Sequence, residues 1–217
     1  MPTRQNMIDH PQFWKAFLIF LGPLIVTNIL QNLSGTVNTI FVGQMLGVNA
    51  IAAISVFFPI LFLLLAFVIG LSSGATVLVG QAWGAKNVEK VRTIVGSLLF
   101  MTLIGGTIIA LVGAFFSKHI LLLLGIDPKI MHLSLPYVRW MLLGSPFLFM
   151  YITYTSILRG VGDSTTPLIA SGLTIIIGLI TTPILIGGYF GFPKMGIVAP
   201  AIASTLGFIG VLIFLYL

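Results

Sequence analysis

The chain has 217 residues, of which 58% are hydrophobic and only 6% are charged. A soluble domain carries about 25% charged residues because its surface faces water, so this composition excludes a soluble globule and predicts an integral membrane protein. The formal net charge is +6, but the basic residues stand singly between apolar runs. That arrangement is typical of membrane-protein loops and argues against nucleic acid as a partner.

Apolar runs long enough to span a membrane, about 20 residues each, follow one another along the chain between polar or Gly/Pro clusters. They predict an all-α membrane protein, a six-transmembrane-helix bundle that forms a single lobe over residues 1–217. The apolar segment Ile120–Leu124 is too short to span, and we interpret it as lying at the membrane interface. The predicted helices lie near 14–43, 51–81, 91–116, 135–158, 167–187 and 196–217.

Several of these predicted helices contain a proline, which removes a backbone hydrogen bond and favours a bend. Bent helices around an interior are more typical of transporters than of rigid anchors. The prolines concerned are Pro23, Pro59, Pro146, Pro183 and Pro200.

The basic residues favour one orientation in the membrane. With the N-terminus in the cytoplasm, six fall on the inner side and four on the outer side, which is the bias expected of cytoplasmic loops. We therefore expect a multi-pass protein of the cell (inner or plasma) membrane with both termini cytoplasmic. The inner residues are Arg4, Lys15, Lys86, Lys90, Arg92 and Arg159, and the outer ones are Lys118, Lys129, Arg139 and Lys194.

The first predicted helix carries a polar stripe. Asn28, Gln31, Gly35 and Asn38 are spaced three, four and three residues apart, which places them on one helix face. Amides that face lipid are unfavourable, so this face is expected to look into protein or water. A stripe of this length favours a wall that lines a cavity, while hydrogen bonding between helices is the alternative.

The second predicted helix contains GLSSGAT from Gly70, which fits the G-x-S-x-G pattern of hydrolases by letter. That motif needs a strand-to-helix turn and a histidine partner, whereas His10, His119 and His132 all lie in predicted loops. Small residues at this spacing instead allow membrane helices to approach closely. The histidines also lack ligand spacing and the chain has no cysteine, so no metal site is expected.

Acidic residues are missing from the interior of all six predicted spans. A proton relay normally needs a carboxylate there, and an intramembrane enzyme needs a titratable group at that depth, so we expect no catalytic residue. Asp163 follows Arg159 in a predicted loop, where it is expected to form either a local ion pair or a helix cap.

Motifs along nearly the whole chain resemble those of multidrug and toxic compound extrusion (MATE) transporters, in the same order. They are GPLIVTN from Gly22, TVNTIFVG from Thr36, GLSSGATVLVGQ from Gly70, ILRGVGDSTTP from Ile157 and FPKMGIVAPAIAS from Phe192. The resemblance implies one half of a twelve-helix protein that exports cationic or amphipathic small molecules by sodium or proton antiport. This chain would be the N-terminal lobe, and a second six-helix lobe and membrane lipid would be its partners.

The sequence departs from the MATE pattern at acidic positions. An aspartate that members often carry in the first helix is Asn38 here, and an Asn/Asp pair in the fifth helix corresponds to Gly178 and Thr182. The resemblance therefore implies that the coupling ion acts through the missing C-terminal lobe and that no cofactor is bound. The substrate-binding candidates in this lobe are Asn28, Gln31, Asn38, Thr182 and Ser204.

Other functions remain open from the sequence. A related lipid-linked oligosaccharide flippase would be expected to have a strongly charged interior groove, which the predicted spans do not show. A membrane scaffold that transports nothing is a further alternative, against which the polar stripe of the first helix argues. The last predicted helix ends in apolar residues without a basic flank, as expected of one lobe of a longer protein.

Overall fold

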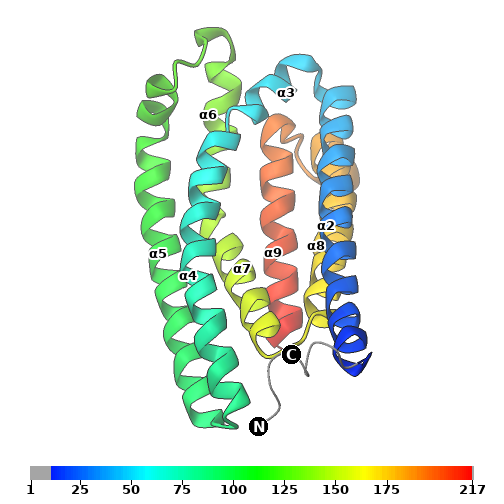
Figure 1. Ribbon diagram of the computed structural model, residues 1–217. Helices are drawn as coiled ribbons and strands as arrows, with labels where there is room; N and C mark the ends of the chain where they lie inside the picture. Colours follow the sequence, from blue (N-terminus) through cyan, green and yellow to red (C-terminus); the bar gives the residue numbers. More distant parts are fainter. Residues whose placement is uncertain (1–10, 217) are drawn as a thin grey trace.

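Long apolar helices make up the computed structural model, which describes residues 11–216 (Figure 1). No strand occurs among these residues. The helices are α2 (Pro11–Leu46), α3 (Val48–Ser55), α4 (Phe58–Gly84), α5 (Val88–Leu123), α6 (Pro128–Leu143), α7 (Ser145–Gly160), α8 (Thr165–Gly187) and α9 (Ala199–Tyr216), with short 3-10 turns at Tyr189–Gly191 and Gly196–Val198.

The predicted number of spans is confirmed. Five segments are long and apolar enough to cross a membrane, and α6 and α7 together form a sixth that bends by 47°. Large apolar side chains cover the outside of the bundle; Leu63 is 73% exposed and Phe115 is 76% exposed. Such a surface is unfavourable in water and suits the hydrocarbon of a bilayer.

The fourth span is not the single helix predicted near 135–158. It begins earlier, at Pro128, because Asp127 caps the helix by accepting a hydrogen bond from the backbone N–H of Lys129 at 2.8 Å. It breaks at Gly144, just before Pro146, whose ring removes the hydrogen bond that would continue the helix. The expected proline bend is therefore present here.

Other boundaries also differ from the prediction. The second span is divided between α3 and α4, and Pro59 lies in the first turn of α4, where a missing N–H leaves no hydrogen bond unmade. Pro200 likewise lies in the first turn of α9 and bends nothing inside it. Ile120–Leu124 is not a separate segment, because α5 continues through Leu123. That these residues lie at the membrane interface stays a prediction. Helix α5 has 36 residues, more than one span requires, so the length of a span does not predict where this helix ends.

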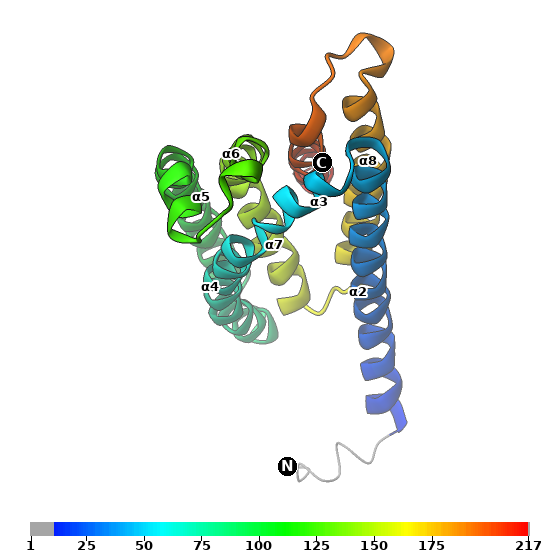
Figure 2. The same ribbon diagram turned by 90° about the horizontal axis from the view of Figure 1, so that it is seen from above.

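The helices form two groups that α9 joins (Figure 2). In one group α4 and α5 pack on α7, and α5 also packs on α6; in the other, α2 packs on α8. Helix α9 packs on α8 and also contacts α6 and α7. The main core includes Phe149, which is fully buried, and the buried ring of Tyr137 edge-on to Phe57 at 6.1 Å.

Helices α4 and α7 approach closely at Gly80 and Gly160, and not at Gly70 and Gly74 of the GLSSGAT motif, where an added Cβ would meet nothing within 4 Å. A Cβ added at Gly80 would lie 3.1 Å from the carbonyl oxygen of Gly160, and one added at Gly160 would lie 3.0 Å from that of Thr76. Ser72, the central serine of the hydrolase-like pattern, is buried and shares a 3.2 Å hydrogen bond with Thr153. That serine therefore belongs to helix packing.

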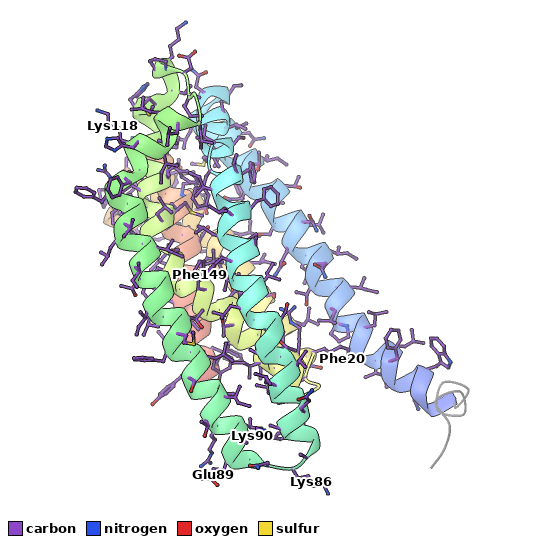
Figure 3. The ribbon with its side chains drawn as sticks, turned by 60° about the vertical axis from the view of Figure 1, so that its left-hand side comes forward. Phe20, Lys86, Glu89, Lys90, Lys118 and Phe149 are labelled. Carbon is purple, nitrogen blue, oxygen red and sulfur yellow. The ribbon has the colours of Figure 1, made fainter. Side chains whose placement is uncertain are left out.

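Helix α2 begins and α9 ends at the same end of the bundle, which also carries the α4–α5 turn (Figure 1). Lys86, Glu89 and Lys90 mark this end (Figure 3). The expectation that both termini lie on the same side of the membrane therefore agrees with where α2 begins and α9 ends (Figure 1). That this side is cytoplasmic stays a prediction, and Arg4, on which it partly depends, lies outside the described residues.

Candidate functional site

A wide hollow of about 530 Å³ lies between α2, α4 and α7. Its α7 residues recur every four positions, at Tyr151, Thr155 and Arg159, which places them on one face of that helix. Most of its polar groups are uncharged. The full lining is Gln31, Leu65, Ile69, Ser73, Thr76, Tyr151, Ile152, Thr155, Ser156 and Arg159.

Ser171 of α8 connects the walls of this hollow. Its Oγ shares a 2.8 Å hydrogen bond with the hydroxyl of Tyr151 and accepts a 3.5 Å hydrogen bond from Nε2 of Gln31. Ser171 and Tyr151 are both buried. Three helices, α2, α7 and α8, are therefore held in register by one polar cluster, which we call the Ser171 cluster (Ser171, Tyr151 and Gln31).

Arg159 is the charged residue of the wide hollow. Its Nε donates to the carbonyl oxygen of Thr155 and its Nη2 to the Thr155 hydroxyl, both at 3.2 Å, so the side chain folds back along α7. No carboxylate belongs to the lining. The hollow therefore presents hydrogen-bonding groups and one positive charge.

Of the two roles expected for Asp163, the structure shows the helix cap and not the ion pair with Arg159. Its carboxylate accepts hydrogen bonds from the backbone N–H groups of Thr165 at 2.9 Å and Thr166 at 3.0 Å, at the start of α8. Partial burial alone would raise the pKa of Asp163, but the hydrogen bonds from Thr166 and Thr165 outweigh it and hold the pKa below its ordinary value.

A small hollow of about 80 Å³ lies near the α3 end of the bundle. Asn38 lines it together with Thr39, Val42, Ile51, Ile54, Ser55, Phe58, Tyr137 and Pro200. The Oδ1 atom of Asn38 is buried and accepts no hydrogen bond from any described residue. A buried amide oxygen without a partner is destabilising by about 1–3 kcal/mol, so a donor from water or from a bound molecule suits this position.

The five candidate residues are not brought into one site. Gln31 lines the wide hollow and Asn38 the small one. The other three line neither. The exposed Asn28 donates from Nδ2 to the carbonyl oxygen of Leu24, Thr182 is buried in α8, and Ser204 donates to the carbonyl oxygen of Pro200 at 2.8 Å. Substrate binding by these five residues stays a prediction.

The polar stripe of α2 combines both roles that the sequence allowed. Gln31 bonds to another helix through Ser171, whereas Asn28 bonds to its own helix. Asn38 lines the small hollow, and its buried Oδ1 is unpaired. A Cβ added at Gly35 would meet nothing within 4 Å, so this part of the stripe borders open space. Hydrogen bonding between helices therefore accounts for Gln31 but not for the other polar residues of the stripe.

Sequence reasoning missed the α7 wall of the wide hollow. The sequence pattern could have indicated this wall, since Tyr151, Thr155 and Arg159 recur every four residues in a predicted helix. Ser171 gave no such signal, because a lone serine in an apolar helix is ordinary. No group of three metal-ligating side chains occurs among residues 11–216.

Comparison with known proteins identifies relatives for most of the chain. The MatE family model matches residues 23–184. The chain is 42% identical over 196 residues to the probable multidrug resistance protein YoeA of Bacillus subtilis, covering 90% of this chain and 42% of that protein. It is 29% identical to a protein named FAD transporter from Shewanella oneidensis, covering 85% of this chain and 42% of that protein.

Solved structures share the fold. The crystal structure of a mutant of the Vibrio cholerae MATE transporter VcmN superposes with a TM-score of 0.85 at 27% identity, covering 93% of this chain and 45% of that one. The chain thus spans about half the length of the relatives it matches. The expected half-length lobe of a MATE transporter is confirmed.

Proposed function

The chain belongs to the MatE family of membrane transporters, and from this premise we propose that it works as the N-terminal half of a multidrug exporter driven by cation antiport. Relatives named as multidrug resistance proteins support export of drug-like molecules. The wide hollow is the observation that most supports the proposal, because a space of about 530 Å³ lined by apolar side chains, neutral polar groups and the single charge of Arg159 suits an amphipathic small molecule.

One lobe supplies only one wall of such a site. Alternating access in secondary transporters comes from one repeat moving against another around a site near the membrane centre. The Ser171 cluster links α2, α7 and α8 through hydrogen bonds of 2.8 and 3.5 Å, which favours movement of these helices as one wall. We therefore infer that the second six-helix lobe is the partner that closes the site, and that the chain itself catalyses no reaction.

The coupling ion, sodium or a proton, acts through the second lobe. The described acids Glu89, Asp127 and Asp163 all lie at the starts of helices, outside the apolar centres of the spans. A hard cation or a coupled proton needs an anionic group. The same reasoning places the negative group that would bind a cationic drug in that lobe.

An anionic substrate is the second candidate. Arg159 is the charged residue among those lining the wide hollow, and one relative is named an FAD transporter. A guanidinium binds carboxylate or phosphate groups well. Under this alternative the Arg159 side chain would contact the substrate directly.

Transport by a fused protein distinguishes these candidates. In the fused transporter, this chain is followed by the C-terminal half of the Bacillus subtilis relative. We expect cation-gradient-driven transport of ethidium in proteoliposomes, and none with the 217-residue chain alone. Robust ethidium transport by the chain alone would overturn the two-lobe proposal, and transport of FAD in place of ethidium would favour the anionic alternative.

A further inference from the structure

Two cationic side chains lie away from both hollows, on the outer side of α5 and α6. Arg139 of α6 and Lys118 of α5 are both exposed, and these two helices pack against each other. Lys118 lies near the end of α5 opposite Lys86, Glu89 and Lys90 (Figure 3). Neither residue belongs to the proposed transport wall.

The guanidinium of Arg139 is held by one hydrogen bond and is otherwise open. Its Nε donates to Oγ of Ser117 at 3.4 Å, and Ser117, which is fully buried, donates in turn to the carbonyl oxygen of Ala114. The two terminal nitrogens of Arg139 bond to no residue in the described part of the chain. They form the paired donors that match two oxygens of a phosphate.

The height of this position along the bundle matches a headgroup layer. Glu89 and Lys118 are 29 positions apart in one continuous helix. At 1.5 Å per residue they are separated by about 44 Å, and a bilayer with its headgroups is about 40–45 Å thick. If Glu89 lies in one headgroup layer, Lys118 lies in the other.

The neighbouring side chains are those of a lipid-facing surface. Phe115 is 76% exposed and Trp140, next to Arg139, is 48% exposed. Pro136, Arg139, Trp140 and Leu143 recur at helical spacing along the exposed face of α6. Exposed tryptophan is typical of the level where acyl chains meet headgroups.

No carboxylate in the described part of the chain neutralises this pair. Asp127, between α5 and α6, caps α6 through the backbone of Lys129, and Glu89 lies at the other end of α5. Arg139 and Lys118 therefore form an uncompensated positive site at a membrane surface, where each such charge favours an anionic lipid.

We propose that Arg139, oriented by Ser117, and Lys118 bind the phosphate of an anionic phospholipid headgroup, with Trp140 against the upper acyl chain. This inference goes beyond the proposed transport function and does not depend on the substrate. Under this proposal, lipid both surrounds the helix bundle as its solvent and binds to α5 and α6 as a specific ligand.

Quenching of Trp140 by brominated lipid tests the proposal. Trp14→Phe and Trp83→Phe leave Trp140 as the reporter, since the chain has three tryptophans. The purified chain in detergent is titrated with brominated phosphatidylglycerol or brominated phosphatidylcholine. We expect phosphatidylglycerol to bind preferentially, and Arg139→Gln to weaken its binding about fivefold, the effect of one charge at an anionic membrane surface.

Matched variants distinguish lipid binding at this site from the general attraction of anionic lipid to a positively charged protein. Lys194→Gln removes a cation at the same end of the bundle, between α8 and α9, and should leave the Trp140 signal unchanged. Ser117→Ala should weaken phosphatidylglycerol binding at unchanged net charge. The proposal is overturned if both lipids quench equally, if Lys194→Gln matches Arg139→Gln, or if millimolar inorganic phosphate displaces the lipid.

Discussion

The two hollows differ in how their polar groups are satisfied. Beside the wide hollow, Oγ of Ser171 bonds both to the hydroxyl of Tyr151 and to the amide of Gln31, across three helices. In the small hollow, the Oδ1 of Asn38 is buried without a partner. A satisfied polar cluster fixes the positions of helices, whereas an unsatisfied group is free to bind something that the protein does not supply.

Overpacking the contact between α4 and α7, the two helices that line much of the wide hollow, should have the largest effect. Gly160→Val would place a side chain about 3 Å from the backbone oxygen of Thr76 and force α4 from α7. Overpacking of this kind is destabilising by about 1–3 kcal/mol. Gly74→Val on α4 is the control, because its Cβ meets nothing within 4 Å. Unfolding of the purified chain in detergent measures both, and equal stability of the two variants would contradict the close contact.

The effects of Ser171→Ala and Asn38→Leu on the free energy of unfolding compare the two hollows. Ser171→Ala removes the partner of the buried Tyr151 hydroxyl, and we expect a loss of about 1 kcal/mol in the free energy of unfolding. Asn38→Leu removes an unpaired group and should change stability by less than about 0.5 kcal/mol, or increase it. Equal losses in the same unfolding assay would show that Asn38 is also part of the helix packing.

The smallest effect concerns the start of α8, which carries Ser171. Because the pKa of Asp163 is lower in the folded protein than in the unfolded chain, its ionised form stabilises the fold above about pH 4 and this contribution is lost as the pH falls further. Asp163→Asn should therefore flatten the acid limb of stability against pH. Unchanged acid sensitivity would show that the cap contributes nothing measurable.

The sequence predicted the apolar spans well, since they follow from local composition, but it predicted close helix contact at the GLSSGAT glycines, whereas the contact lies at Gly80 and Gly160. It predicted a bend at Pro146 but not that the helix would break at Gly144, because a proline can end, begin or merely bend a helix, and tertiary packing decides which. The polar stripe of α2 was visible as a pattern, but the partners of its amides lie on other helices. Only the fold shows that Gln31 reaches Ser171 while the Oδ1 of Asn38 meets no donor.

The central claim is that this lobe binds substrate without supplying the coupling acid. Its most direct test is the ion dependence of export by Asn38→Ala in the fused transporter. Asn38 forms hydrogen bonds but carries no titratable charge, so we expect weaker ethidium export with an unchanged dependence on pH and sodium. Thr107→Ala, on the exposed face of α5, is the control and should export normally. Loss of the pH or sodium dependence in Asn38→Ala, with substrate binding intact, would contradict the assignment and place the coupling site in this lobe.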